Sequence, residues 1–258
     1  MRTHTLDCPI DILTREEIIE KARHSMVERV PCMHVSLNVA KLVSARTDMD
    51  LAKDIKAADI VGIDGMGIAL AMRLTGYGSA SRFAGVDLFE ELMALCAREG
   101  LRPFLLGARQ EVLVEAMHRL ERQNPGLKFA GHHHGYFDGR DAEIVNIVRS
   151  ANPDCLFLAM PSPRKERFMA RWRQELDVPF VMGIGGTLDV MAGKVSLAPR
   201  LIQRLGFEWA YRLAQEPRRM WRRYLSTNLQ FAGLLTRAVL FRLFGFSPTT
   251  SDVPGKPS

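Results

Sequence analysis

Short apolar segments alternate with longer amphipathic segments along this chain as far as Pro199. The short segments are residues 32–38, 59–63, 102–107, 127–131, 154–160 and 179–183. Their lengths and their aliphatic and β-branched content are typical of buried strands. The segments between them begin at helix-start signals, such as the capping box Thr14-Arg15-Glu16-Glu17. This alternation predicts an α/β fold, with a Rossmann-like, mainly parallel sheet and helices on both of its faces.

The pattern changes after Pro199, where strand-like segments end. We predict an α/β core over residues 1–199, a helical appendage over 200–246 and a disordered tail over 247–258. Residues 200–258 contain 10 Lys and Arg against 3 Asp and Glu, so the net charge of +6 is concentrated there. A basic surface of this kind attracts phosphate groups of nucleic acids, anionic lipids or diphosphate substrates.

Two interpretations of the appendage follow from its sequence. Trp209, Trp221 and several leucines recur near helical spacing, with arginines between them. Such a helix either packs on the core with a solvated basic face, or lies at a membrane interface as a basic amphipathic element. We favour a membrane-associating appendage, because nearly all of its charge is arginine, which suits bidentate phosphate contacts.

The sequence also indicates where the protein works. The N-terminal segment has no signal-peptide pattern, and the four cysteines are scattered without a C-x-x-C pair. Residues 225–246 are apolar, but Arg237 and Arg242 interrupt them, which disfavours a transmembrane span. We therefore expect a cytoplasmic protein that is peripheral on the inner face of the cell membrane.

Candidate functional residues follow the predicted strands, because parallel sheets bind ligands beyond the carboxyl ends of their strands. Ser36 and Asn38 end the first long strand, and Asn38 has the position of a helix N-cap. Asp64 follows the next strand and is flanked by glycine. It is either a general base or ligand for a sugar hydroxyl, or a turn residue that caps the following helix.

A glycine-rich turn follows the last predicted strand. Gly183, Gly185 and Gly186 lead into a helix-like segment that contains Asp189. Free backbone N–H groups at such a turn bind a diphosphate, although a simple tight turn is the alternative. The turn lacks the Lys-Ser/Thr of a P-loop, and Gly62, Gly65 and Gly67 do not have the dinucleotide spacing. We predict no nucleotide cofactor.

Two further motifs have competing interpretations. Lys165 and Glu166 open a helix just after a strand, either as substrate ligands or as a solvated first turn. The run His132-His133-His134 invites a metal site, but successive strand residues point to opposite faces and no Cys or carboxylate lies at a ligand spacing. We predict no metal.

Together these segments resemble the WecG/TagA/CpsF family of bacterial glycosyltransferases, also called glycosyltransferase family 26. The resemblance covers residues 36–224. The motifs, in chain order, are Asn38, Asp64-Gly-Met-Gly, Ser81-Arg82-Phe-Ala-Gly85-Val-Asp87, Leu106-Gly107, Gly135-Tyr136-Phe137, Pro163-Arg-Lys-Glu166, Gly183-Ile-Gly-Gly186-Thr-Leu-Asp189, Ala192-Gly193-Lys194, Ala198-Pro199, Gly206-Phe-Glu208-Trp209-Ala-Tyr-Arg212 and Glu216-Pro217-Arg218-Arg219.

The resemblance implies an inverting, metal-independent transferase that needs no cofactor. It would move a sugar from a UDP-sugar to a polyprenyl-diphosphate-linked sugar, undecaprenyl in bacteria, in surface or exopolysaccharide synthesis. Its partners would be these substrates and the membrane surface, with a possible homo-oligomer. Nucleic acid is not expected, because the tail lacks the interleaved aromatic residues and the fold signatures of such binders. The alternative is a non-catalytic protein that binds nucleotides or polyanions.

The resemblance also implies roles for individual residues. Asp64 matches the general base of the family, with Ser36 and Asn38 beside it. In the family the appendage docks on the membrane and closes over the site. The implied substrate-binding residues are Arg82, Asp87, Lys165, Glu166, Arg212, Arg219 and Arg222. The implied nucleotide-binding residues are Gly107, Tyr136, Gly183, Gly185, Gly186 and Asp189.

The chain departs from the family pattern at two positions. Many members have Pro-x-Gln-Glu where this chain has Pro163-Arg164-Lys165-Glu166, so a neutral amide becomes a cation. Leu197 stands where an arginine usually precedes Ala-Pro. The first departure bears on the identity of the sugar, and the second removes one candidate phosphate contact.

Overall fold

A computed structural model describes residues 2–77, 84–199, 201–202, 207–215 and 217–244. Within the last two helices it describes only the backbone of residues 212, 218–220, 222–224, 241, 243 and 244. The predicted disordered tail, 247–258, and the predicted phosphate ligand Arg82 lie outside the described residues.

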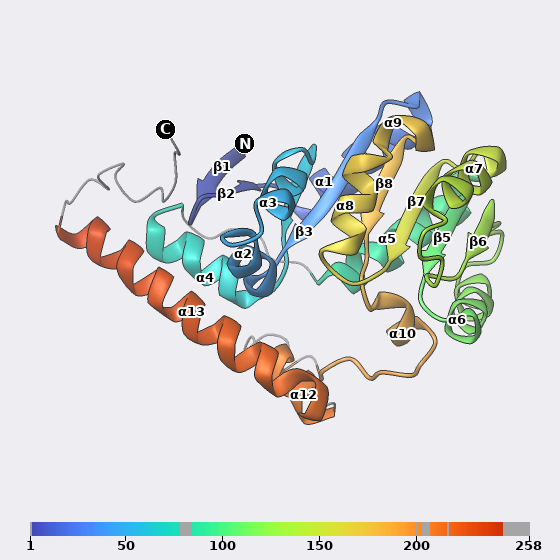
Figure 1. Ribbon diagram of the computed structural model, residues 1–258. Helices are drawn as coiled ribbons and strands as arrows, with labels where there is room; N and C mark the ends of the chain where they lie inside the picture. Colours follow the sequence, from blue (N-terminus) through green and yellow to red (C-terminus); the bar gives the residue numbers. More distant parts are fainter. Residues whose placement is uncertain (1, 78–83, 200, 203–206, 216, 245–258) are drawn as a thin grey trace.

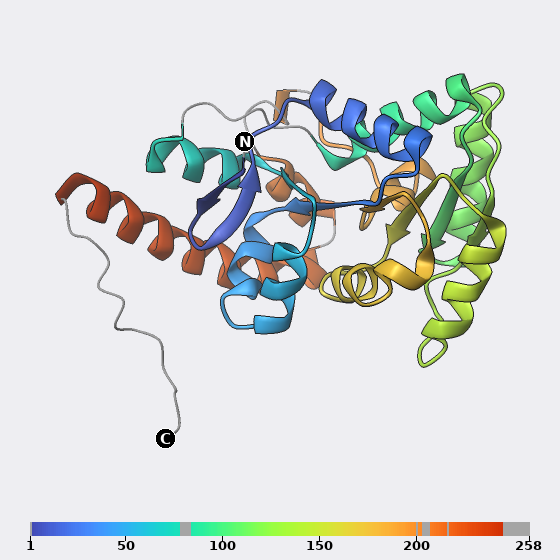
Figure 2. The ribbon, with the colours of Figure 1, turned by 90° about the horizontal axis from the view of Figure 1, so that it is seen from above.

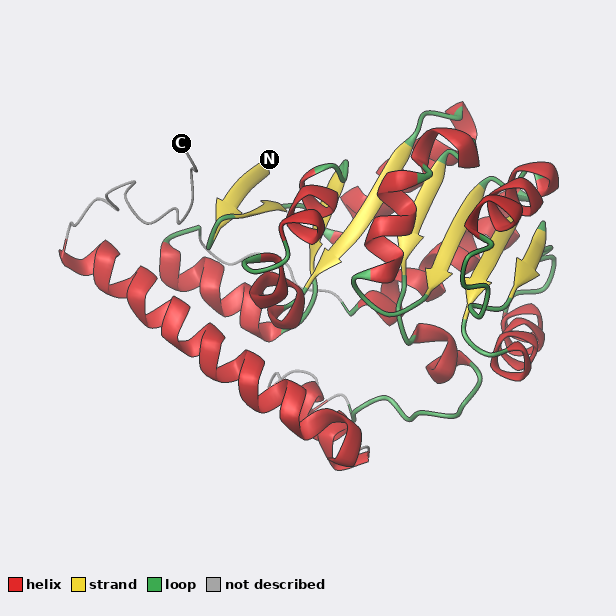
Figure 3. Ribbon diagram, viewed as in Figure 1, coloured by secondary structure: helices red, strands yellow, loops and turns green. Residues whose placement is uncertain are grey.

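A six-stranded sheet in the order β4-β3-β8-β7-β5-β6 forms the centre of the molecule, and all of its pairs are parallel (Figure 1). The strands are β3 (Cys32–Leu37), β4 (Ile60–Ile63), β5 (Pro103–Gly107), β6 (Gly131–His133), β7 (Cys155–Ala159) and β8 (Phe180–Gly183). The predicted α/β class and parallel sheet are confirmed. In Figure 3 the arrowheads of these strands point to one side, where α10 and α12 lie.

The predicted strand 127–131 was placed too early, because β6 begins only at Gly131. The preceding residues form a turn in which Leu127 N donates to Asn124 O and Gly126 has a φ of 94°. The Leu127 side chain is buried in the helix layer. Pairing with β5 therefore starts where Ala130 N donates to Pro103 O.

Helices cover both faces of the sheet, as Figure 2 shows from above. The apolar cluster on one face includes side chains of α1 (Arg15–Glu28), α5 (Gly85–Glu99), α6 (Gln110–Gln123) and α10 (Thr187–Met191). The cluster on the other face includes side chains of α2 (Val39–Ala45), α3 (Met49–Lys56), α4 (Met66–Thr75), α7 (Asp141–Ala151), α8 (Arg164–Arg171) and α9 (Arg173–Leu176). Thr14 and Glu17 form the predicted capping box of α1.

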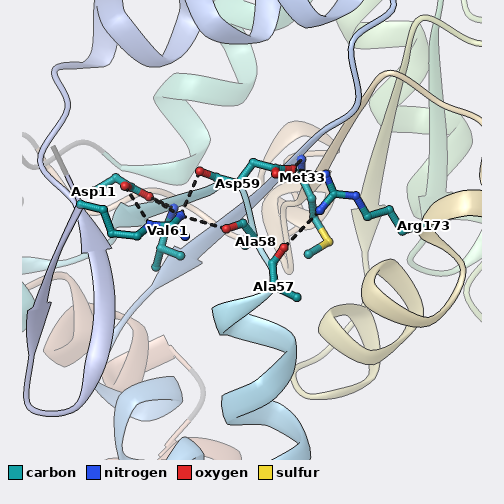
Figure 4. A network of polar contacts seen from close by, with 8 residues as sticks. Asp11, Met33, Ala57, Ala58, Asp59, Val61 and Arg173 are labelled. Atoms are coloured by element: carbon teal, nitrogen blue, oxygen red, sulfur yellow. Dashed lines mark hydrogen bonds and ion pairs between the residues drawn. The ribbon is translucent and has the colours of Figure 1, made fainter.

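An N-terminal hairpin of β1 (Arg2–Thr5) and β2 (Cys8–Asp11) was not predicted. Its strands have four residues each, and its turn uses Leu6 and Asp7 in left-handed conformations rather than a glycine signal. Asp11 anchors the hairpin by accepting from Arg2 Nη2 at 2.8 Å and from the backbone N of Val61 at 2.8 Å (Figure 4).

The same contacts continue across the amino ends of β3 and β4. Asp59 Oδ2 accepts from the backbone N of Met33 at 2.7 Å and from Arg173 Nη2 at 2.6 Å. Arg2 also donates to the Asp59 carbonyl at 2.9 Å. This network ties the hairpin and α9 to the amino ends of β3 and β4. These ends lie opposite the carboxyl ends, where parallel sheets bind ligands, so we assign the network a structural role.

The chain continues into α12 (Glu208–Gln215) and α13 (Pro217–Phe244). Helix α13 runs along α2 and α4 (Figure 1). Phe231 is only 8% exposed and joins the core, with Leu234 and Leu235 packed beside it. Arg242 Nη1 donates to the Leu74 carbonyl at 2.7 Å. Among the described residues, no helix is both long enough and apolar enough to cross a membrane.

Candidate active site

Asn38 and Asp64 lie next to each other at the carboxyl ends of β3 and β4. The strands pair in register, with Leu37 opposite Ile63, so the residues that follow them are adjacent. Asp64 N donates to Leu37 O at 2.9 Å, and Asn38 Nδ2 lies 3.5 Å from Asp64 Oδ2. The amide of Asn38 therefore orients a carboxylate that is partly exposed at the ligand-binding edge of the sheet.

The two residues have different local roles. Asn38 is the N-cap of α2, as predicted, because its Oδ1 accepts from Lys41 N at 3.0 Å. Asp64 does not cap the following helix. Gly65, with a φ of 89°, is the N-cap of α4, and no side chain makes a cap hydrogen bond there. The Asp64 carboxylate is thus not used by the helix and is available for chemistry.

Ser36 lies two residues before Asn38 and is 7% exposed. It pairs with Gly62 of β4, which lies two residues before Asp64. Its carbonyl accepts a hydrogen bond from Lys41 Nζ. The backbone of Ser36 therefore links the strand end to α2.

Two lysines share one carboxylate beneath this edge of the sheet. Lys41 Nζ and Lys165 Nζ both lie 3.0 Å from Glu166 Oε1. The three side chains are 6%, 7% and 0% exposed for Lys41, Lys165 and Glu166. We call these residues the lysine–glutamate cluster. The alternative in which Lys165 and Glu166 form a solvated first turn is wrong, because α2 and α8 pack over the same face of the sheet.

Burial and charge shift the pKa values of this cluster. Burial, together with the neighbouring Lys41, lowers the pKa of Lys165 to about 8, while Glu166 and Asp64 oppose the shift. Burial alone would raise the pKa of Glu166, but Lys41 and Lys165 outweigh it and lower that pKa to about 2. At neutral pH Glu166 is therefore ionised and Lys165 is mostly protonated, although both side chains are buried.

The lysine–glutamate cluster contacts the predicted glycine turn. A Cβ added to Gly183 would lie 2.9 Å from Lys165 Cδ, so the lysine stem packs directly on the glycine. Beyond it, Ile184 N and Gly185 N donate to Leu158 O at 2.9 and 3.3 Å, so the expectation that the N–H groups of this turn are free for a diphosphate is wrong for these two. Gly186 precedes α10, a helix of five residues with Asp189 in its first turn.

The other predicted nucleotide-binding residues lie at the carboxyl ends of β5 and β6. Gly107 has a φ of 131°, and an added Cβ would lie 2.4 Å from Ala159 O, so only glycine fits there. Tyr136 is 61% exposed. The pKa of Arg109 is raised by its hydrogen bond to Tyr136, and Asp189 adds to this shift. An aromatic ring and a cation thus lie together over this part of the edge.

Sequence reasoning missed Lys41 and Arg109. Lys41 is a single cation in the apolar run Val39-Ala-Lys-Leu-Val43, three residues after the N-cap, and this was the available signal. Arg109 follows the Gly107 turn directly at the end of a strand. Both residues follow the carboxyl end of a parallel strand, as the predicted site residues do.

Several predicted residues are placed only in part. Asp87 is partly exposed in the first turn of α5, which begins at Gly85. The backbones of Arg212, Arg219 and Arg222 lie on α12 and α13, while their side chains, like the whole of Arg82, are outside the described part of the chain.

The histidine run forms β6 and the turn after it. His133 Nδ1 lies 2.7 Å from the His134 carbonyl, and Tyr136 N donates to His134 Nδ1 at 3.2 Å. These contacts fix the loop that presents Tyr136. Within the described residues, no three His, Cys, Asp or Glu side chains gather as a possible metal site.

Comparison with known proteins agrees with the motifs. The profile of the glycosyl transferase WecG/TagA/CpsF family matches residues 3–244. A protein of Bacillus subtilis (strain 168), N-acetylglucosaminyldiphosphoundecaprenol N-acetyl-beta-D-mannosaminyltransferase, is 32% identical over 204 residues, or 79% of each chain. The protein of the same name from Bacillus spizizenii is 35% identical over 172 residues, covering 67% of this chain and 66% of the relative.

Proposed function

Since this chain belongs to the WecG/TagA/CpsF family of glycosyltransferases, we propose that it transfers a sugar from a UDP-sugar to an undecaprenyl-diphosphate-linked saccharide. The two Bacillus relatives are named for an N-acetylmannosaminyl transfer to N-acetylglucosaminyldiphosphoundecaprenol. An N-acetylhexosamine donor and an acceptor of that class are therefore the first substrates to test. The product would enter bacterial surface or exopolysaccharide synthesis.

The observation that carries this proposal is the Asn38–Asp64 pair at the strand ends. In the proposed reaction Asp64 takes the proton from the acceptor hydroxyl as that oxygen attacks the anomeric carbon. The bond between the anomeric carbon and the diphosphate breaks, and its electron pair leaves with UDP. Attack from the side opposite to the leaving group inverts the anomeric configuration.

The donor would bind along the same edge, towards β5, β6 and β8. Tyr136 offers a ring for the base, with Arg109 and Asp189 beside it. The glycines of the 183–186 turn would let the diphosphate approach the backbone closely, while Ile184 N and Gly185 N stay hydrogen-bonded to Leu158 O. We propose that Arg82 and the appendage residues Arg212, Arg219 and Arg222 add positive charge around the leaving group, so that no metal is needed.

The test is a panel of UDP-sugars with a polyprenyl-diphosphate-linked N-acetylglucosamine acceptor. We expect release of UDP that requires both substrates, that persists in EDTA and that gives a product of inverted configuration by NMR. Release of no UDP from any donor would contradict the proposal. Tight UDP binding without turnover would support the alternative, a non-catalytic nucleotide-binding protein.

We further propose that the appendage places the enzyme on the membrane surface. Helix α13 buries Phe231, whereas Trp221, Leu225 and Leu229 recur every fourth residue and are 48%, 56% and 66% exposed. An exposed apolar stripe on a basic helix suits an interface that contains anionic lipid.

Exchanging Leu225 and Leu229 for glutamine should weaken sedimentation with anionic vesicles by about tenfold or more. Complete burial of two leucines contributes roughly 3–6 kcal/mol, and burial at an interface is only partial. The matched control exchanges Val27 and Val30, which are 45% and 49% exposed on and just after α1. Equal vesicle binding by both double variants would show that α13 is not the docking surface.

A further inference from the structure

The lysine–glutamate cluster by itself has one more cation than it has carboxylates, and the further carboxylate that acts on Lys165 is the partly exposed Asp64. Lys41 and Lys165 pair with the single carboxylate of Glu166, and all three side chains are at most 7% exposed. Burying two cations that share one carboxylate is costly, so this arrangement calls for an explanation. His34, which Lys41 also influences, does not change this charge, because burial lowers its pKa to about 3 and keeps it neutral.

The excess charge lies between the two places where negative charge changes during the proposed transfer. Asp64 is close enough to raise the pKa of Lys165, and the Lys165 stem packs on Gly183, the first residue of the proposed diphosphate turn. Transfer neutralises Asp64 as it gains a proton and adds one negative charge to the departing UDP. A cation against the turn stabilises this redistribution of charge.

We propose, on the basis of the proposed function, that Lys165 is a positioning cation whose charge, fixed by Glu166, stabilises the diphosphate of the donor and of the leaving UDP at the 183–186 turn. Because only 7% of the Lys165 side chain is exposed, its ammonium group would act on the diphosphate by electrostatic attraction through a region of low dielectric constant. Direct contact with the substrate would contribute little. A neutral glutamine, which the family pattern described above has at this position, would not supply this charge.

A pH dependence follows from this assignment. Lys165 is charged below its pKa of about 8 and becomes neutral above it, so the stabilising charge is lost as the pH rises. The groups that face it are Lys41 from α2, Glu166 from its own helix and Asp64 from the β4 turn. From α3, Asp54 lies near Glu166, and burial raises the pKa of its carboxyl group.

The buried thiols do not account for such a transition. Burial raises the pKa of Cys8 to about 11 and that of Cys32 to about 12, so both stay protonated through this range. The phosphates of UDP, with a last pKa of about 6, are already fully ionised at pH 8. A change in UDP affinity above pH 8 would therefore come from the protein.

Lys165→Met tests the proposal, because it keeps the apolar stem and leaves Lys41 and Glu166 as a balanced pair. At pH values below 8, we expect kcat/KM for the UDP-sugar to be about tenfold to a hundredfold lower in Lys165→Met than in the parent. The parent should lose activity from about pH 8 upward, whereas Lys165→Met should be flat across this range. Lys165→Gln, which restores the usual amide, should behave in the same way and guards against a packing defect in the methionine variant.

Lys53→Met is the matched control, since it removes one lysine from the exposed face of α3. It should keep the rate and the pH profile of the parent. An alkaline limb retained in both Lys165 variants, or a rate equal to that of the parent below pH 8, would overturn the proposal while leaving the proposed function intact.

Calorimetric UDP binding from pH 7 to pH 10 separates the two claims, because it needs no turnover. If the parent transfers no sugar, the proposed function fails. Affinity that falls above pH 8 in the parent but not in Lys165→Met would still support the role of Lys165. The same pH dependence in both proteins, or no UDP binding at all, would overturn it.

Discussion

Asparagine in place of Asp64 should lower kcat for sugar transfer by about 10²–10⁴-fold, the usual contribution of a positioned general base. The exchange conserves shape, and the hydrogen bond from the residue 64 backbone to Leu37 O does not involve the side chain. An amide next to Asn38 accepts no proton from the acceptor hydroxyl at neutral pH. Steady-state kinetics with both substrates saturating would measure the loss, and calorimetry should give nearly unchanged UDP affinity.

Asp177→Asn is the control for this experiment. Asp177 is exposed at the amino end of β8, where it has a left-handed conformation that asparagine tolerates. That variant should keep its kcat within about twofold, because it lies far from the charge change of the reaction. If Asp64→Asn retained the parental kcat, Asp64 would not be the base, and the carboxyl edge of β4 would have to be assigned another role.

Glutamine in place of Glu166 should lower the free energy of unfolding by about 3–5 kcal/mol, the cost of removing one partner from a buried ion pair. The parental carboxylate is completely buried between Lys41 and Lys165, and the variant would remove the negative charge that lies 3.0 Å from each ammonium group. Urea denaturation at pH 7 would measure the loss. At pH 9 to 10 the loss should shrink, because Lys165 can then be neutral.

Two comparisons make this prediction specific. Glu143→Gln removes one half of the exposed Arg140–Glu143 pair, whose atoms are 3.8 Å apart, and should cost about 0–1 kcal/mol. Adding Lys165→Met to Glu166→Gln should restore part of the stability, because one buried charge disappears. Equal losses in Glu143→Gln and Glu166→Gln would mean that the lysine–glutamate cluster is open to water.

In the parent, Glu166 should also make the fold sensitive to acid. Its folded pKa of about 2 is below the ordinary 4.5, so its stabilising effect is complete above pH 4.5 and is lost as the pH falls towards 2. Lys165 has the opposite effect at high pH. Its folded pKa is below 10.5, so its charge destabilises the fold up to about pH 8, and this cost is relieved between pH 8 and 10.5.

The sequence was sufficient to predict most of the sheet, because each parallel strand is a local apolar run between helix signals. It was also sufficient to predict Asn38 and Asp64 at one edge, since residues that end neighbouring strands must meet. The β1–β2 hairpin was missed, because four-residue strands with a Leu6-Asp7 turn have no local signature. Strand β6 was misplaced because Leu127 is buried by helices rather than by strand pairing.

The lysine–glutamate cluster could not be predicted for a different reason. It forms only because α2 and α8, which are far apart in the chain, pack over the same face of the sheet. Locally, Lys165 and Glu166 look like an ordinary charged first turn. Their charges are buried only when the helices pack on the sheet, so the spacing of residues in the sequence does not predict this burial.

The contact between Gly183 and the Lys165 stem makes two positions that are far apart in the sequence depend on each other. A methyl group at 183 would displace the lysine, whereas a shorter side chain at 165 would leave room for it. The effect of a mutation at either position thus depends on the residue at the other. Glutamine at 165 would not remove this dependence, because it keeps a Cδ atom, so a side chain at 183 requires a residue at 165 that ends at Cγ or earlier.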